Sequence, residues 1–220
     1  MKIIKYKPEK YQFKELVCSV FDTSELDKIH ERRGDLLPLE KLCFENESKT
    51  KFHDAFYKKL NSGWPPFMRS YRHFIENEVY PLFKRKIIYQ NTPSFRVHLP
   101  GSKAIHKWHY DSDPDHMHPE WEINFQIAIT DIYKTNAMWV ESAPGLRDYG
   151  PIEMKYGEFA AFDGNRCAHG NKPNKEKTTR MSFDFRVIPY ERYIEDEESA
   201  SITSNKKFVV GEYYSVCDME

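Results

Sequence analysis

Beyond residue 86 the sequence breaks into short extended runs that are separated by turn residues. The runs are SFRVHLPG, AIHKWHY, EWEINFQIAIT, NAMWVES, GEFAAFDG and TTRMSFDFRVI. Such a series is typical of an antiparallel sandwich or barrel. In the third run, apolar and polar residues alternate from Glu122 to Ile129, which predicts a strand with one apolar and one polar face. Inside a barrel, the polar face is where a ligand would bind.

The region from Tyr11 to Phe83 has apolar residues at helical spacing instead. Trp64-Pro65-Pro66 marks a helix start, because proline is tolerated in a first turn, and Pro81 marks where that helix should fray or end. We therefore expect a single, mostly β domain of the α+β class. Its parts are a helical region over 1–86 packed on one outer face, a barrel over 87–190, and a tail or flap over 191–220.

The composition excludes several classes of partner. Thirty-three basic and 34 acidic residues give a net charge of −1, and no long basic stretch is present, so we expect no binding to nucleic acid or to an anionic membrane. The N-terminus lacks the continuous apolar run of a signal peptide or membrane span. Four cysteines without a CxxC pair indicate free thiols in a reducing compartment. We expect a cytoplasmic protein.

His109 and Asp111 can bind one metal ion, because residues i and i+2 of an extended strand project from the same face. This H-x-D pattern is weak alone, since a chain with nine histidines can contain one by chance. His169 follows 58 residues after Asp111 (169 − 111), in FDGNRCAHGN. Two histidines and one carboxylate form the facial triad of non-haem iron(II) oxygenases, which leaves other coordination positions open.

Arg180 and Ser182 lie on a predicted strand, where they share one face with Asp184 and Arg186. A guanidinium binds a carboxylate through two parallel hydrogen bonds, and a serine hydroxyl can donate a third to the same group. This R-x-S pair therefore suits the far carboxylate of a dicarboxylic keto acid.

With these motifs the sequence resembles the iron(II) and 2-oxoglutarate-dependent dioxygenases. The segments EINFQIAITDIYKTNAMWVESAPGLRDYGP and GEFAAFDGNRCAHGNKPN also look like oxygenases of streptomycin-type biosynthetic clusters, over about residues 94 to 190. The resemblance implies a double-stranded β-helix of the jelly-roll or cupin-like type. It also implies Fe(II) on His109, Asp111 and His169, and 2-oxoglutarate anchored by Arg180 and Ser182.

The resemblance implies a reaction with O2 in which 2-oxoglutarate is converted to succinate and CO2 and an unactivated carbon is hydroxylated. Halogenating relatives replace the metal-binding carboxylate with a small residue, so Asp111 favours hydroxylation. Asn124, on the polar face of its strand, is a candidate for hydrogen bonding to the keto acid, and it also fits a strand asparagine satisfied by a neighbouring turn.

Five residues on or beside the predicted barrel mouth are candidates for substrate binding: Arg96, Trp108, Trp139, Glu141 and Arg186. Trp139 and Glu141 share a strand face and can receive an amine or guanidinium through charge pairing and cation–π contact. They point to a small polar metabolite, such as an amino acid, an aminosugar or a related biosynthetic intermediate. The same pair also fits a core tryptophan beside a structural salt bridge.

A competing interpretation uses His116, His118 and Glu122, whose H-x-H-x-x-x-E pattern resembles the first metal motif of small cupins. It would make the protein a non-catalytic barrel that binds a metal or a sugar. Pro119 and the lack of a following glycine oppose it, and they predict a surface loop for both histidines. An oxygenase acting on protein side chains is a further alternative.

Three other side chains have structural interpretations. His106 should face away from His109, and His98 and Cys167 fit packing roles. The run KKFVVGEYYSV can pair with another chain or close over the pocket, so both a monomer and a homodimer remain open.

Overall fold

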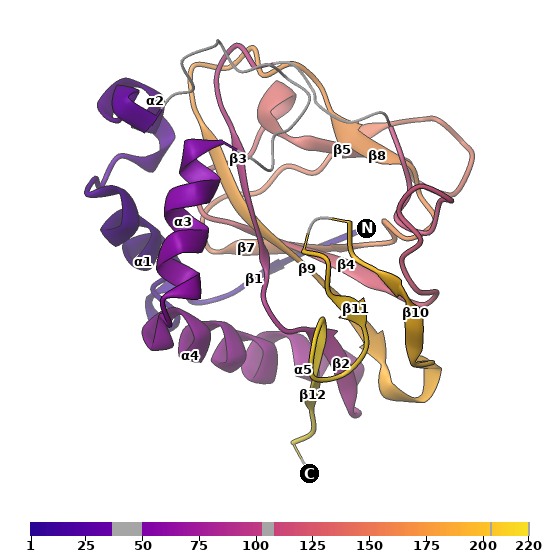
Figure 1. The fold of residues 1–220 in the computed structure, drawn as a ribbon. Helices are drawn as coiled ribbons and strands as arrows, with labels where there is room; N and C mark the ends of the chain where they lie inside the picture. The colour runs from indigo at the N-terminus through magenta and orange to yellow at the C-terminus, as the bar shows by residue number, and fades with distance from the viewer. Residues whose placement is uncertain (37–49, 103–107, 203, 220) are drawn as a thin grey trace.

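The computed structural model describes residues 1–36, 50–102, 108–202 and 204–219, which form mostly antiparallel sheet with helices on one side (Figure 1). The helices are α1 (Phe13–Phe21), α2 (Ile29–Arg32), α3 (Lys51–Asn61), α4 (Pro65–Phe74) and α5 (Tyr80–Phe83). The strands are β1 (Lys2–Lys5), β2 (Ile87–Gln90), β3 (Ser94–His98), β4 (Ile123–Ala128), β5 (Met138–Val140), β6 (Gly150–Pro151), β7 (Glu158–Phe162), β8 (His169–Asn171), β9 (Arg180–Pro189), β10 (Asp196–Ala200), β11 (Lys207–Phe208) and β12 (Tyr214–Cys217). Within the described ranges, no helix is long and apolar enough to cross a membrane.

The larger sheet has the strand order β1-β7-β4-β9-β2-β12 and is built around the ten-residue strand β9. β4 pairs with one edge of β9, while β3 and β2 follow each other along its other edge. The smaller sheet has the order β6-β5-β8. An isolated bridge between His109 and His169 adds the H-x-D segment to the edge of β8.

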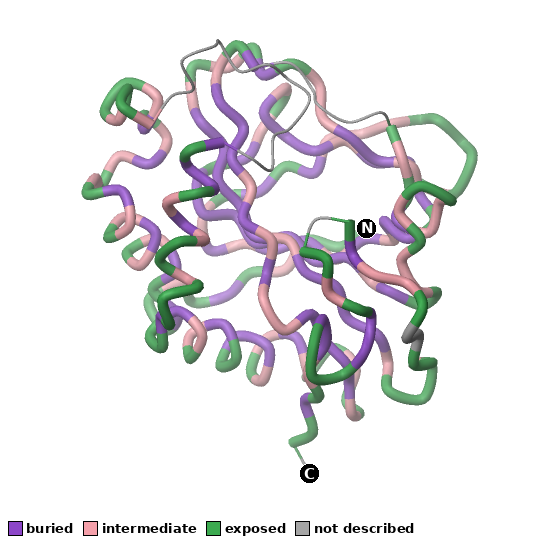
Figure 2. Tube along the Cα trace, in the orientation of Figure 1, coloured by how far each residue is buried: buried purple, intermediate pink, exposed green. Residues whose placement is uncertain are grey.

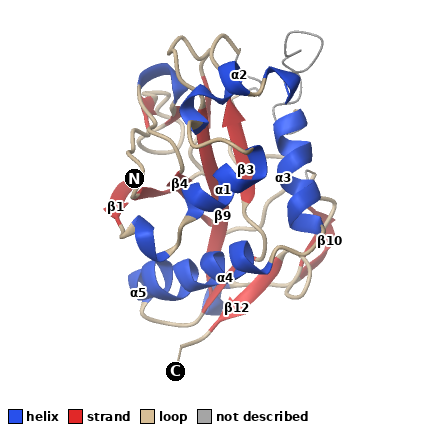
Figure 3. Cartoon of the chain, turned by 90° about the vertical axis from the view of Figure 1, so that its left-hand side faces the viewer, coloured by secondary structure: helices blue, strands red, loops and turns tan. Residues whose placement is uncertain are grey.

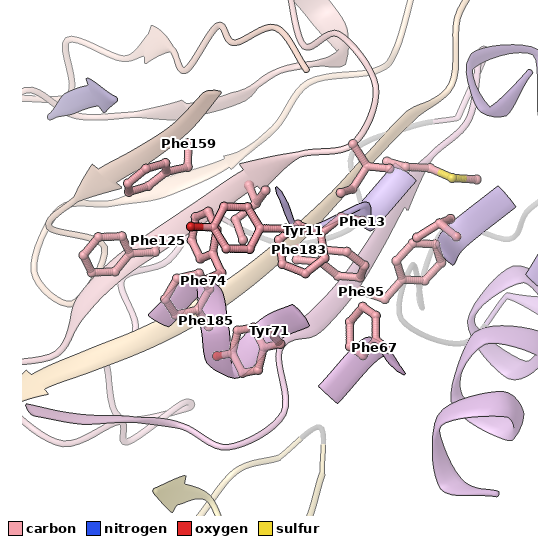
Figure 4. Packing of buried hydrophobic residues seen from close by; sticks show 14 of the residues in the cluster. Tyr11, Phe13, Phe67, Tyr71, Phe74, Phe95, Phe125, Phe159, Phe183 and Phe185 are labelled. Atoms are coloured by element: carbon pink, nitrogen blue, oxygen red, sulfur yellow. The ribbon is translucent and has the colours of Figure 1, made fainter. Parts of the chain in front are cut away.

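The main hydrophobic core lies between the larger sheet and the helices (Figures 3 and 4). Phe183 and Phe185 of β9 and Phe125 of β4 point to this side, where Phe185 packs edge-on against Tyr71 of α4 at 5.6 Å. Burying each such ring contributes on the order of 2 kcal/mol. The expectation of a mostly antiparallel sheet with some helices is thereby confirmed, and Phe125 of β4 lies on the apolar face that the alternation predicts.

The opposite face of β9 carries Arg180, Ser182, Asp184 and Arg186, as the period-2 pattern predicts. A second hydrophobic cluster joins Ala128 and Phe162 of the larger sheet to residues of the smaller sheet, and a third joins the C-terminal segment to β2 and β9. The inner strands are therefore buried along most of their length (Figure 2). These contacts enclose the polar face of β9 within the protein.

Three local features differ from the sequence expectation. β1 is a strand at the edge of the larger sheet, paired with β7, although the sequence predicted helices over 1–86. The helix does not end at Pro81, because a π-helical segment, Ile75–Val79, is followed by α5, and Pro81 lies in the first turn of α5, where a missing N–H is tolerated. Of AIHKWHY, residues 104–107 lie outside the described ranges, and His106 is among them.

Candidate metal centre

His109, Asp111 and His169 converge at one point between the two sheets, each offering one ligand atom within 4.8 Å of the others. Oδ1 of Asp111 lies 3.5 Å from Nε2 of His169 and 3.7 Å from Nε2 of His109. Asp111 and His169 are buried, and His109 is partly exposed. Two imidazole nitrogens and a carboxylate oxygen are a donor set that fits iron(II) and other divalent transition metals. The three residues predicted from the sequence are brought together by the fold.

The other oxygen of Asp111 is fully engaged by the protein. Oδ2 accepts a hydrogen bond from Nδ2 of Asn124 at 2.7 Å and two from Arg186, at 3.0 Å from Nε and 2.8 Å from Nη2. Burial favours the neutral acid, but Arg186, the nearby histidines and Asn124 hold the pKa of Asp111 well below its usual range. Asp111 is therefore ionised and fixed, with Oδ1 directed at the two imidazoles.

Backbone hydrogen bonds set the register of this segment. The N–H of Asp111 donates to the carbonyl of Gly164 at 2.9 Å, and His109 and His169 exchange N–H···O=C bonds at 3.2 and 2.8 Å. Gly164 also lies directly under Asn124: a Cβ at this position would be 2.7 Å from Asn124 Cγ and 2.8 Å from Phe162 Cε2. Only glycine leaves room there for the amide that holds Asp111.

Each imidazole is oriented by a neighbour. Nδ1 of His169 lies 3.1 Å from the carbonyl oxygen of Cys167, to which it donates, so its Nε2 carries the lone pair that faces Asp111. The ring of His109 stacks on His116 at 4.2 Å, and His116 is held by Asp113 at 2.7 Å. Cys167 therefore contributes a backbone carbonyl to the site.

Arg180 and Ser182 lie on the inner face of β9, as predicted. Arg180 is 2% exposed, and its Nη1 donates to Oδ1 of Asn171 at 3.1 Å. Asn171 is two residues after His169 on β8, which places Arg180 beside the metal-binding strand. His98 lies opposite Arg180, and burial together with Arg180 lowers the pKa of His98 to about 3. It is thus a neutral buried residue.

Asn124 and Arg186 have a role that the sequence analysis missed. We expected Asn124 beside the keto acid and Arg186 beside the substrate, and those roles stay predictions. In the structure, both side chains bind Asp111. They are direct cross-strand partners on β4 and β9. The strand period predicted their inward direction, but nothing in the local sequence links either residue to an aspartate more than ten positions away.

Of the other candidates for substrate binding, Trp139 and Glu141 have partners within the chain. Lys172 Nζ lies 3.2 Å from the centroid of the Trp139 ring. The Glu141 carboxylate accepts three backbone N–H bonds, from Gly145, Arg147 and Ala168, at 2.9 to 3.1 Å. The Glu141 carboxylate therefore holds the loop that contains Gly145 and Arg147.

Trp108 and Arg96 both keep part of their side chains exposed to solvent. Trp108 is 38% exposed and packs over Gly170, whose added Cβ would lie 3.2 Å from the indole ring. Nε of Arg96 donates to Oδ2 of Asp184 at 2.7 Å.

His118 and Glu122, two of the three residues in the cupin-like pattern, meet beside Asp111 and form a second group able to hold a metal. Nδ1 of His118 lies 2.8 Å from Oε2 of Glu122, and Oε1 of Glu122 accepts a 2.5 Å hydrogen bond from the hydroxyl of Tyr214. His116 belongs to neither group. The C-terminal segment thus packs directly on the cupin-like residues.

The structure describes, in sum, a two-histidine, one-carboxylate centre between two antiparallel sheets. No protein-family model matches the sequence. The chain is similar, at TM-scores below 0.5, to three solved structures with 13–16% sequence identity. They are a non-haem monooxygenase, ThoJ, in complex with nickel (0.47; 91% of this chain and 78% of that one); the non-haem alpha-ketoglutarate-dependent carbocyclase SnoK from nogalamycin biosynthesis (0.46; 66% and 68%); and CytC3 with Fe(II) and alpha-ketoglutarate (0.45; 84% and 78%). Likenesses this weak establish neither activity nor substrate.

Sequence similarity, in contrast, shows the family of the chain. The streptomycin biosynthesis protein StrG of Streptomyces griseus is 32% identical over 170 residues, which are 77% of this chain and 78% of that protein. The chain belongs to the StrG family.

Proposed function

We propose that the protein is an iron(II)- and 2-oxoglutarate-dependent oxygenase that hydroxylates a small polar metabolite and releases succinate and CO2. The observation that carries this proposal is that the two carboxylate oxygens of Asp111 have different partners. One oxygen faces Nε2 of both histidines, and the other is held by Asn124 and Arg186. A fixed, ionised carboxylate beside two oriented imidazoles is what a facial-triad metal needs.

The bound iron and 2-oxoglutarate would supply the oxygen activation, and the chain's own residues would orient and enclose them. His169 is fixed by the Cys167 carbonyl, and Asp111 by Arg186. Arg180 is a buried cation on the same inner face, suited to the far carboxylate of the keto acid. The hydrophobic clusters beside this polar face would limit the access of water to the bound groups.

The experiment that tests the proposal is anaerobic titration of the protein with iron(II) and 2-oxoglutarate. A visible metal-to-ligand charge-transfer band is expected, followed by succinate formation when oxygen is admitted. Asp111→Ala and His169→Ala should abolish both signals. His73→Ala, a substitution on the exposed side of α4, is the matched control and should leave both unchanged.

A second candidate function is a non-catalytic metal-binding barrel, which the Asp111, His118 and Glu122 group favours. It predicts metal binding that is lost in His118→Ala and kept in His169→Ala, with no charge-transfer band and no succinate. That combination of results would replace the oxygenase proposal.

A further inference from the structure

The inner face beside the metal centre carries hydrogen-bond donors that the protein does not use. Arg96 of β3 donates from Nε to Asp184, and its two Nη groups make no hydrogen bond with any residue that the structure describes. Its side chain keeps 25% exposure, although its strand neighbours Phe95 and Val97 are buried. Both Nη groups of this guanidinium, which carry four of its five N–H bonds, therefore remain open on this face.

The Arg96 guanidinium binds the residue of β9 that lies between Ser182 and Arg186 on the inner face. Arg96 pairs with Ser182 across the sheet, but its guanidinium binds Asp184, which is one inward-facing position closer to Arg186. Arg186 uses Nε and Nη2 on Asp111, which leaves Nη1 without a hydrogen bond in the described ranges. Arg96 and Arg186 therefore lie on the same face of the sheet, with Asp184 between them.

A third donor comes from the C-terminal segment. Tyr213 is 4% exposed and lies in the cluster that closes the tail over β2 and β9, and its ring is 6.0 Å from the ring of His118, which meets Asp111. Burial raises the pKa of its hydroxyl, while Arg186 and Arg96 lower it and the carboxylates of Glu122 and Asp111 raise it further, so the group stays protonated. No hydrogen bond of this hydroxyl to another described residue is present.

We infer that Arg96, Arg186 and Tyr213 form an oxyanion subsite, which binds a carboxylate or phosphate group of the substrate next to the metal centre. All three side chains offer donors, and two of them are guanidiniums, whose best partners are carboxylates and phosphates. This inference rests on the proposed function, because only an enzyme has a substrate. It adds that the substrate carries an anionic group. The expected amine-binding residues, Glu141 and Trp139, are already engaged by the chain.

The test uses the protein saturated with zinc(II), which is redox-silent, and with 2-oxoglutarate. The metal site and the proposed keto acid anchor, Arg180, are then already filled. The thermal unfolding midpoint is then measured against rising inorganic phosphate, acetate or glycerol at constant ionic strength, which removes general salt effects. Phosphate or acetate should raise the midpoint saturably, and glycerol should show no saturation. The stronger of the two anions identifies the group that the substrate carries.

Two variants localise the effect. Arg96→Gln should weaken anion binding about tenfold, because it removes a charge-assisted pair of hydrogen bonds. Tyr213→Phe should weaken it less, and it covers the case in which Arg96→Gln does not fold. Arg69→Gln, on the exposed side of α4, is the matched control.

Absence of any saturable anion effect would overturn the subsite, as would equal binding by wild type and both variants. Saturable glycerol binding that is lost in Arg96→Gln would assign the donors to a neutral polyol instead. The charge-transfer band distinguishes a failure of the anion subsite from a failure of the oxygenase function. A band without anion binding removes only the subsite, whereas anion binding without a band removes the oxygenase and keeps an anion site.

Discussion

The position of Asp111 depends on a residue without a side chain. Gly164 supplies the carbonyl that accepts the Asp111 N–H, and the space above it is filled by the Asn124 amide that binds Asp111 Oδ2. One residue thus sets both the backbone register and the side-chain geometry of the carboxylate. The sequence FDGN gave a turn signal at this point, but the contact with Asn124 joins residues 40 positions apart (164 − 124).

We predict that Gly164→Ala disrupts the metal centre. The new Cβ would lie 2.7 Å from Asn124 Cγ, so the amide must move away from Asp111. Metal affinity should fall about tenfold or more, which is the usual effect of losing a residue that orients a ligand. Calorimetric titration with iron(II) or manganese(II) measures it. Gly150→Ala is the control, because no atom lies within 4 Å of its added Cβ. Unchanged affinity in Gly164→Ala would show that Asn124 does not hold Asp111.

At the scale of elements, the C-terminal segment is attached to the site by one buried hydrogen bond. β12 pairs with β2, and the Tyr214 hydroxyl reaches Glu122, just before β4. Phe208 packs on the His118 ring at 4.7 Å. The tail therefore covers two of the three residues of the cupin-like pattern, His118 and Glu122.

Tyr214→Phe should destabilise the fold by about 1–3 kcal/mol, because it leaves a buried carboxylate oxygen without its donor. Urea unfolding followed by circular dichroism gives the value. The matched control is Tyr190→Phe, whose ring is 46% exposed, and it should change stability by less than about 0.5 kcal/mol. Equal stability of both variants would mean that the tail is held by its apolar contacts alone.

The elements that the sequence predicted were those with a clear period. The alternation in EINFQIAIT gave the two faces of β4, and TTRMSFDFRVI gave those of β9. The strand β1 was missed because KIIK is too short for a period and is strand only through its pairing with β7. The π-helical segment before Pro81 was missed because proline by itself signals a helix end.

The residues of the candidate site also fall into those that the sequence predicted and those that it did not. H-x-D and R-x-S have a spacing that local strand geometry can interpret, so they were predicted. His169, 58 residues after Asp111, was added through the resemblance to the iron(II) and 2-oxoglutarate-dependent dioxygenases. Asn124 and Arg186 bind Asp111 because β4, β9 and the H-x-D segment meet in space, and Tyr213 reaches the site through the tail. Contacts of this kind depend on strand order, which a single sequence does not encode locally.

For the molecule as a whole, acid should lower stability through a buried histidine that belongs to neither group able to hold a metal. His53 follows the N-cap Thr50 of α3, with its Nδ1 2.8 Å from the Thr50 hydroxyl, and packs on Phe95. Burial, with a smaller effect from Arg96, lowers the pKa of His53 from 6.5 to about 3. The unfolded chain therefore binds a proton below about pH 6.5 that the native protein does not bind until about pH 3.

The free energy of unfolding should consequently fall as the pH drops from 6.5 toward 3, by on the order of 5 kcal/mol at most from this residue. His53→Gln removes the titrating group and should flatten the decline between pH 6.5 and 4.5 in urea titrations, whereas the exposed His73→Gln should not. His98 contributes a decline of the same sign that both variants keep. Parallel pH curves for His53→Gln and wild type would contradict the prediction.

The hydrogen bonds on Asp111 also limit the denticity of the carboxylate. Oδ2 already accepts three N–H bonds, so only Oδ1 can become a ligand atom. Asp111 would therefore bind a metal as a monodentate ligand and could not shift to a chelating mode. With one atom from each of three residues, an octahedral ion would keep half of its coordination sphere for molecules other than the protein.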